Sequence, residues 1–226
     1  MAAGKRSGQG FLITLEGGEG AGKSSQISLL AERFEELGYP VVTTREPGGT
    51  TGAEIIRHVL LSGAAEPFGE HLEAILFAAA RADHVEQLIR PALEAGKIVI
   101  CDRYIDSTRV YQGLCGKVDP EFLKDLEYAV CEGAWPDLTI VLDLDPKTGM
   151  ARANKRRSKT DKPDRFEKDT LKLQKQRRNA FLQLAKEEPE RIKVVSASGS
   201  MKQVAARVWK TTTKHLSIEM DSELMT

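Results

Sequence analysis

The chain has 226 residues, of which 41% are hydrophobic and 29% are charged, and this composition favours one large soluble domain with its own core. Its 33 basic residues balance 33 acidic ones, so the formal net charge is zero, which argues against binding nucleic acid or a membrane surface through bulk charge. The first ten residues are polar and rich in glycine, unlike a signal peptide, and no run approaches the roughly 20 apolar residues of a membrane span.

The predicted elements alternate between strands and helices along the whole chain. Short apolar runs predict strands, and apolar residues at three- and four-residue spacing predict helices. In chain order we expect a strand at 11–15, a helix at 24–37, a strand at 40–44, helices at 53–61 and 72–95 (the second interrupted near Pro91), a strand at 98–101, a helix at 122–130, a strand at 138–142, a helix at 170–185, a strand at 192–195 and a helix at 201–213.

The apolar runs are continuous, as expected for strands that are covered on both faces. The sequence therefore predicts an α/β protein with a five-stranded parallel sheet flanked by helices in three layers. No repeat or change in composition marks a second domain. We expect a single domain over residues 11–214, with tails at 1–10 and 215–226.

Residues 17–24, GGEGAGKS, match the pattern G-x-x-x-x-G-K-[ST] between a predicted strand and a predicted helix. Glycines let the backbone curl so that its N–H groups point inward, and the helix dipole adds positive potential there. The fold class is therefore the P-loop NTPase fold. The predicted ATP-binding residues are Gly17, Gly18, Glu19, Gly20, Ala21, Gly22, Lys23, Ser24 and Ser25.

A magnesium ion is the cofactor that such a loop implies. The hydroxyl of Ser24 is one expected ligand, and an acid at the end of another strand is the second. Asp102 and Asp143 both end predicted strands. Asp102 is preferred because Arg103 follows it at once, which pairs an acid for the metal with a cation for phosphate.

Residues 43–52, TTREPGGTTG, place Arg45 at a turn that is neither helix nor strand. A P-loop protein could be a GTPase, a mechanical ATPase or a small-molecule kinase. A GTPase needs Asn-Lys-x-Asp, but Asn154 and Lys155 are followed by two arginines. A mechanical ATPase usually carries further domains. Only a kinase with a phosphorylated acceptor explains a second cationic site.

Four further features, in this order, resemble the thymidylate kinase family: REPGGT at 45–50, Phe77 with Arg81 four residues on, DRY at 102–104 and DRFE at 164–167. The resemblance extends from about residue 11 to residue 209. It implies transfer of the γ-phosphoryl group of ATP to dTMP, giving dTDP and ADP for dTTP synthesis. It also implies a homodimer.

The same resemblance assigns the acceptor site residue by residue. Arg45 and Arg103 are similar to the arginines that hold the dTMP phosphate, for which a guanidinium fork is suited. Phe77 resembles the aromatic residue that stacks on thymine, and Arg81 the arginine that bonds a thymine carbonyl. Contacts with base and sugar are implied for three more residues, of which the tyrosine disfavours a 2′-hydroxyl: Thr108, Tyr111 and Gln112.

Residues 152–165 are dense in charge and poor in apolar residues, which fits a solvated loop or a cationic lid. The variable P-loop positions hold no arginine, as in the bacterial members of the family, whose catalytic arginine comes from the lid. The resemblance also places Glu19 near the sugar 3′-hydroxyl. The catalytic residues implied are Lys23, Glu19, Arg103, Arg156, Arg157 and Arg165.

Two other readings remain open at this stage. One is a different nucleoside or nucleotide kinase that acts on dUMP or a deoxynucleoside, and the other is a P-loop regulatory protein that only binds nucleotide. Cys101, Cys115 and Cys131 are odd in number and lack C-x-x-C spacing, which predicts free thiols and a cytoplasmic protein. Neither nucleic acid nor membrane is expected as a partner.

Overall fold

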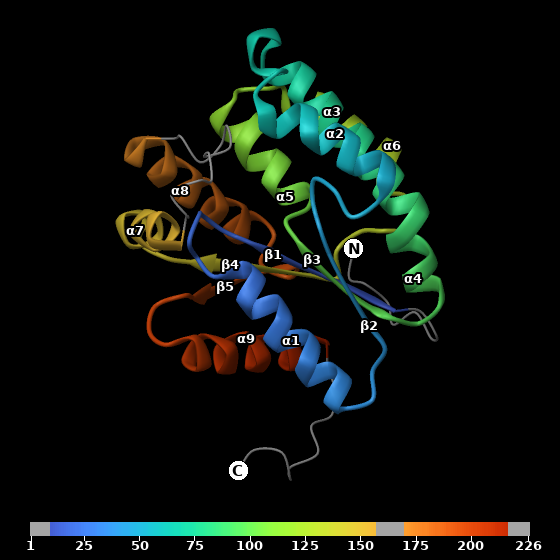
Figure 1. The fold of residues 1–226 in the computed structure, drawn as a ribbon, viewed down its shortest axis with the longest axis vertical. Helices are drawn as coiled ribbons and strands as arrows, with labels where there is room; N and C mark the ends of the chain where they lie inside the picture. The colour runs from blue at the N-terminus through green and yellow to red at the C-terminus, as the bar shows by residue number, and fades with distance from the viewer. Residues whose placement is uncertain (1–9, 157–169, 217–226) are drawn as a thin grey trace.

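The computed structural model describes residues 10–156 and 170–216. Its five strands form one parallel sheet in the order β2-β3-β1-β4-β5 (Figure 1). The strands are β1 (Phe11–Glu16), β2 (Val41–Arg45), β3 (Ile98–Asp102), β4 (Leu138–Asp143) and β5 (Ile192–Ser196). This confirms the predicted five-stranded parallel sheet.

Helices cover both faces of the sheet. Figure 1 shows α1 (Lys23–Glu36) and α9 (Met201–Leu216) side by side below it, and the other helices above it. The upper layer contains α2 (Thr51–Ser62), α3 (Glu70–His84), α4 (Arg90–Glu94), α5 (Ile105–Thr108), α6 (Pro120–Val130) and α8 (Leu171–Glu187). None of the helices in residues 10–156 and 170–216 has the length and apolar character that a membrane span requires.

Successive side chains of the central strands pack alternately against the two helical layers. Ile13 and Leu15 of β1 lie in the core on the α1 and α9 side, whereas Leu12 packs toward α4 and the preceding residues 85–89. The same alternation occurs in β3, where Ile100 and Val99 enter opposite cores. Because each face has its own helical layer, every position of these strands is apolar or internally bonded, which explains the continuous runs.

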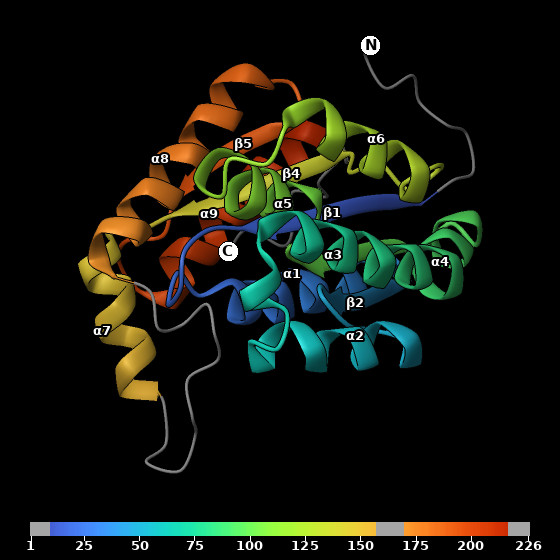
Figure 2. The same cartoon turned by 90° about the horizontal axis from the view of Figure 1, so that it is seen from above.

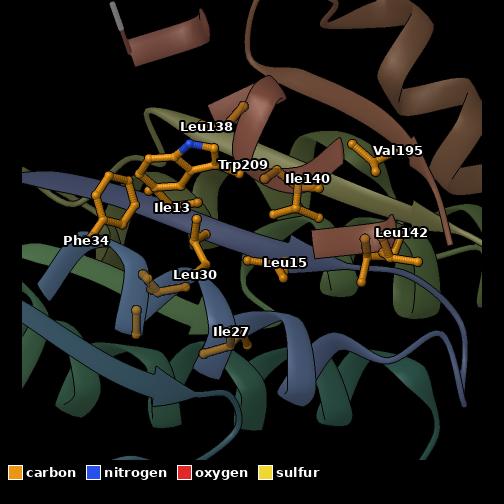
Figure 3. Packing of buried hydrophobic residues seen from close by; sticks show 14 of the residues in the cluster. Ile13, Leu15, Ile27, Leu30, Phe34, Leu138, Ile140, Leu142, Val195 and Trp209 are labelled. Atoms are coloured by element: carbon orange, nitrogen blue, oxygen red, sulfur yellow. The ribbon is translucent and has the colours of Figure 1, made fainter. Parts of the chain in front are cut away.

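The lower core centres on an aromatic contact between α1 and α9 (Figure 3). Phe34 is fully buried, and its ring centroid lies 5.1 Å from that of Trp209 in an edge-on arrangement. Leu30 and Ile27 follow on the same helix face toward the carboxyl ends of the strands. This stack fixes α1 against the sheet, and α1 begins at the P-loop.

The predicted helix at 72–95 is divided in the structure. It comprises α3, a π-helical turn η2 (Val85–Ile89) and α4, which has Pro91 in its first turn. A proline has no N–H to donate and its ring displaces the preceding turn, so the backbone widens by one residue before it.

Four further elements were not predicted. The segment after β3 forms α5 and a π-helical turn η3 (Arg109–Cys115), a short 3₁₀ turn η1 (Glu66–Phe68) precedes α3, and residues 146–156 form α7 (Pro146–Arg156). The charged segment at 152–165 therefore begins within a helix. Residues 157–165 lie outside the described part of the chain.

We expect Phe34→Ala to lower the free energy of unfolding by about 3–5 kcal/mol, because it removes a fully buried ring and leaves a cavity against Trp209. Urea unfolding followed by far-UV circular dichroism measures this. The exposed Met201 supplies the control, and Met201→Ala should change stability by less than about 0.5 kcal/mol. Equal losses in the two variants would contradict the proposed core.

Candidate active site

The carboxyl ends of β1, β2 and β3 open into one cavity of about 230 Å³. Its walls come from the P-loop, the turn after β2, the middle of α3, and α5 with η3. Ligands of open parallel sheets bind at this edge, where the strand order reverses. The lining residues include Glu19, Gly20, Gly22, Lys23, Ser24, Arg45, Glu46, Arg57, Phe77, Arg81, Asp102, Arg103, Ser107, Thr108, Tyr111 and Gln112.

The P-loop curls between β1 and α1 as its glycines require. At Gly20, φ is 65°, and a Cβ atom would lie 2.1 Å from the carbonyl oxygen of Gly149, so no other residue fits there. Gly22 is left-handed as well and is the N-cap of α1. The Nζ of Lys23 donates to the carbonyl oxygens of Gly17 and Gly18, each at 3.2 Å, and so lies over the loop.

A pair of oxygen ligands lies beside Lys23. The hydroxyl of Ser24 donates to Oδ2 of Asp102 at 2.9 Å. A hydroxyl and a carboxylate are hard donors that suit Mg²⁺, which takes few protein ligands and completes its shell with water and substrate phosphates. The alternative acid, Asp143, is instead held by both Nε and Nη2 of Arg178, at 2.6 and 2.9 Å. The geometry therefore favours Asp102 over Asp143.

Two arginines face the P-loop across the cavity. Arg45 ends β2, and its Nη2 lies 2.8 Å from Oε1 of Glu54. The same Glu54 oxygen accepts the N–H of Gly49, so Glu54 ties the glycine turn to the arginine. Arg103 follows β3, and its Nη1 donates to the hydroxyl of Ser107 at 3.2 Å. The prediction that Arg45 lies at a turn outside any strand is wrong, because Arg45 is the last residue of β2 and the turn follows it. The end of β2 thus supplies a cation to the cavity.

A buried ion pair lies at the base of the cavity. Arg81 is 3% exposed and donates from Nε to Glu46 at 2.8 Å and from Nη2 to the hydroxyl of Thr108 at 3.2 Å. His84 holds the second oxygen of Glu46 at 3.0 Å. Burial lowers the pKa of Arg81, but Glu46 more than offsets this, so the pKa lies above its usual value and the cation is fixed.

The remaining predicted acceptor residues also line this cavity, whereas the predicted ATP-binding residues Gly17, Gly18, Ala21 and Ser25 do not. Phe77 and Arg81 lie one turn apart on α3, as their spacing predicted. The ring of Tyr111 lies near two guanidinium groups, 4.0 Å from Arg177 and 5.3 Å from Arg103. Gln112 is buried and approaches Glu73 at 3.4 Å. The structure therefore brings both halves of the predicted site together.

The lid residues are only partly described. Arg156 is the last residue of α7, and Arg157 and Arg165 lie outside the described residues. Arg152, a further candidate, is described, and its Nη1 lies 3.5 Å from the carbonyl oxygen of Ala197. Ala153 of the same helix lines the cavity wall, so α7 borders the site.

Sequence reasoning missed three supporting residues: Glu46, Ser107 and Arg57. Glu46 and Ser107 hold predicted arginines, and Nη1 of Arg57 donates to the carbonyl of Pro47. Glu46 had a sequence signal, because it stands directly after Arg45 in the REPGGT motif. A carboxylate at that position, if buried, needs a cationic partner such as Arg81. Ser107 gave no signal, since its partners are distant in the chain.

Burial and the charge of Arg103 shift the pKa values of two groups at the P-loop, Lys23 and Glu16. Burial, assisted by the charge of Arg103, lowers the pKa of Lys23 to about 8. Glu16, the last residue of β1, is fully buried, and this burial raises its pKa to about 7 against the opposing effect of Arg103.

Comparisons with known proteins agree on one family. A family model described as thymidylate kinase matches residues 15–208. The thymidylate kinase of Bartonella quintana (strain Toulouse) is 56% identical over 199 residues, covering 88% of this chain and 93% of that protein. That of Bartonella henselae is 53% identical over 200 residues, with the same coverage. The crystal structure of thymidylate kinase from Ehrlichia chaffeensis superposes with a TM-score of 0.73 at 31% identity, covering 90% of this chain and 99% of that one.

We expect ATP binding to take up protons, because phosphates near Nζ favour the charged form of Lys23. With a free pKa of about 8, the uptake should rise from near zero at pH 7 through about half a proton at pH 8 toward one at pH 9. Calorimetry in buffers of different ionisation enthalpy measures it. Lys23→Arg keeps a cation that does not titrate in this range, so its uptake should stay near zero. Uptake independent of pH would contradict this account.

Proposed function

The chain belongs to the thymidylate kinase family, and from this premise we propose how its own residues transfer the γ-phosphoryl group of ATP to dTMP, giving dTDP and ADP. One observation carries the proposal. A single cavity presents Lys23 of the P-loop and the two arginines Arg45 and Arg103 to the same space. A donor and an acceptor that both carry phosphate repel each other, and cations on opposite walls offset that repulsion.

The P-loop holds the donor. Its backbone N–H groups and the amino end of α1 bind the phosphates, and Lys23 reaches the β- and γ-phosphates. ATP binding draws Nζ away from the carbonyl oxygens of Gly17 and Gly18, which it contacts here. Glu19 lies in the same wall and faces the acceptor sugar, where a hydroxyl can bond its carboxylate.

Arg45 and Arg103 hold the acceptor phosphate. Arg45 is half exposed, so its pair with Glu54 is weak and is readily exchanged for a phosphate dianion. Arg103 is anchored by Ser107 and stays in place. The two guanidinium groups thus orient the attacking phosphate oxygen in line with the donor, and this positioning supplies most of the rate.

The base and sugar bind on α3 and η3. Phe77 stacks on thymine, and Arg81 donates to a thymine carbonyl from Nη1. Its other two nitrogens are committed to Glu46 and Thr108, which fixes the direction of Nη1. Tyr111 and Gln112 lie against the sugar and the base edge.

Ser24 and Asp102 are the residues that would hold Mg²⁺, and their contact at 2.9 Å fits a shared metal site. When bound, the ion neutralises charge on the donor phosphates. The proposed lid arginines, which close over the transferring group and exclude water, are Arg156, the last residue of α7, and Arg157 and Arg165, which follow it in the sequence. The border of α7 on the cavity supports that placement.

We also propose a homodimer formed through α2 and α3, which pack against each other (Figure 2). In the described part of the chain, four of the ten exposed large hydrophobic residues fall on or between these helices: Ile55, Val59, Phe68 and Ile75. Such a concentration marks a protein interface. A cytoplasmic location is supported by the three cysteines, which are all free.

We expect Arg45→Ala to raise the KM for dTMP by about 10- to 100-fold, since one charge-assisted phosphate contact is lost. The KM for ATP should stay within about twofold, because Arg45 lies on the acceptor wall. A coupled ADP-release assay measures both, and it is run with dTMP, dUMP and thymidine as acceptors. Wild-type turnover should be confined mainly to dTMP.

The matched control for this assay is Arg90→Ala, which truncates an arginine on α4 that pairs with Glu86 and does not line the cavity. Its kinetics should match the wild type. An unchanged KM for dTMP in Arg45→Ala would remove Arg45 from the acceptor site. Turnover mainly with thymidine would leave no role for the two arginines and favour a nucleoside kinase.

For the dimer, we expect sedimentation velocity to give the wild type a mass of about twice 24.9 kDa. Ile55→Asp together with Phe68→Asp should give the monomer mass, because each places a charge in the interface. Met201→Asp, at another exposed hydrophobic residue on α9 across the sheet, should remain dimeric. A dissociated control, or a double variant that stays dimeric, would contradict this interface.

A further inference from the structure

Glu16 is a fully buried carboxylate that the transfer of phosphate does not use. It ends β1 directly before the P-loop, and it turns away from the loop toward α5. Its Oε1 accepts the N–H groups of Tyr104 and Ser107, at 2.8 and 3.1 Å, and its Oε2 accepts the hydroxyl of Ser107 at 2.7 Å. The carboxylate therefore accepts three hydrogen bonds from the residues that follow Arg103, namely Tyr104 and Ser107.

Arg103 itself has a strained backbone. Its φ is 69°, in the left-handed region, which is unfavourable for a residue with a side chain. Its own N–H donates to the carbonyl of Leu15 at 3.0 Å, and the next N–H, that of Tyr104, goes to Glu16. Two consecutive residues of β1 thus hold the peptide groups on either side of Arg103. This hold offsets the strain.

The same carboxylate reaches the guanidinium group through one intermediary. Ser107 donates its hydroxyl proton to Glu16, which leaves the hydroxyl oxygen to accept from Nη1 of Arg103 at 3.2 Å. The orientation of the serine hydroxyl is fixed by the carboxylate, since a hydroxyl carries only one proton. Both the backbone and the side-chain tip of Arg103 consequently depend on Glu16.

Burying a carboxylate is costly, and an apolar side chain at this position would satisfy the core at lower cost. The charge is placed where it supports a cation that faces the cavity. The strand that carries it continues into the P-loop, so the support of the acceptor arginine and the donor loop are parts of one rigid element.

We propose that Glu16 and Ser107 are positioning residues of the acceptor site, which hold Arg103 in a strained conformation at a fixed distance from the P-loop. This inference rests on the proposed role of Arg103 in binding the dTMP phosphate. It predicts that loss of either support weakens the use of dTMP while ATP binding is preserved, because the P-loop keeps its own glycine geometry.

The test compares Glu16→Gln, Ser107→Ala and Ser107→Thr in the ADP-release assay. We expect the first two to lower kcat/KM for dTMP by about tenfold and to leave the KM for ATP within about twofold. Ser107→Thr keeps the hydroxyl and should restore activity to within about threefold of the wild type. Glu16→Gln keeps the size and shape of the side chain, so a kinetic loss in this variant does not come from a cavity in the core.

Asp106→Asn is the control for a merely structural role. Asp106 is as buried as Glu16 and lies on the same short helix as Ser107, but it binds Arg191 and Thr139 rather than Arg103. It should lower the melting temperature without changing kcat/KM for dTMP. An equal kinetic loss in Asp106→Asn would overturn the inference.

Variants in an Arg103→Ala background separate this inference from the proposed function. If Arg103 binds the acceptor, Arg103→Ala alone raises the KM for dTMP, and adding Ser107→Ala has little further effect because both act through one group. An unchanged KM in Arg103→Ala would refute the proposed site itself. A raised KM in Arg103→Ala with unaltered kinetics in Glu16→Gln and Ser107→Ala would refute only the positioning role.

Discussion

The register of three parallel strands is the constraint on which the site depends. Asp102 of β3 lies opposite Leu15 of β1 on one side and Arg45 of β2 on the other. Because parallel strands end at the same edge, this register places the start of the P-loop, the proposed metal ligand Asp102 and the proposed acceptor arginine Arg45 in one row. A slip by one residue would turn Asp102 and Arg45 to opposite faces and separate the two phosphate sites.

Three arginines lie at or near this row, and a carboxylate of the same protein balances the charge of each. Each cation on the acceptor side has its own acid, since Arg45 meets Glu54, Arg81 meets Glu46, and Arg103 is held through Ser107 by Glu16. The pairs differ in how far they are buried, and this difference determines whether the arginine is fixed or can exchange its partner. The pair at Arg81 is almost fully buried and fixes a direction, whereas the pair at Arg45 is open to water and can exchange for a ligand.

The sequence predicted the sheet and the P-loop, because each has a local signature, whereas the acceptor residues were assigned through the resemblance to the thymidylate kinase family. Continuous apolar runs identified the strands, and the glycine spacing identified the loop. The segment after β3 was missed because α5 has four residues and continues as a π-helical turn, too short and too irregular for a periodic pattern. The role of Ser107 could not be predicted either, since its carboxylate partner lies 91 residues away.

A small protein with two anion sites must keep the two sites close together. The cations of each site must also remain available to the ligand rather than pair permanently with a neighbouring carboxylate. The structure meets this requirement with one rigid and one exchangeable cation. Arg103 is bound at both peptide groups and at its guanidinium group, so it cannot follow the phosphate toward the P-loop. Arg45 is held only by an exposed acid on α2, so it can adjust to the ligand. In the proposed site, the fixed arginine would therefore set the distance between donor and acceptor, and the adjustable one would let the acceptor enter and its product leave.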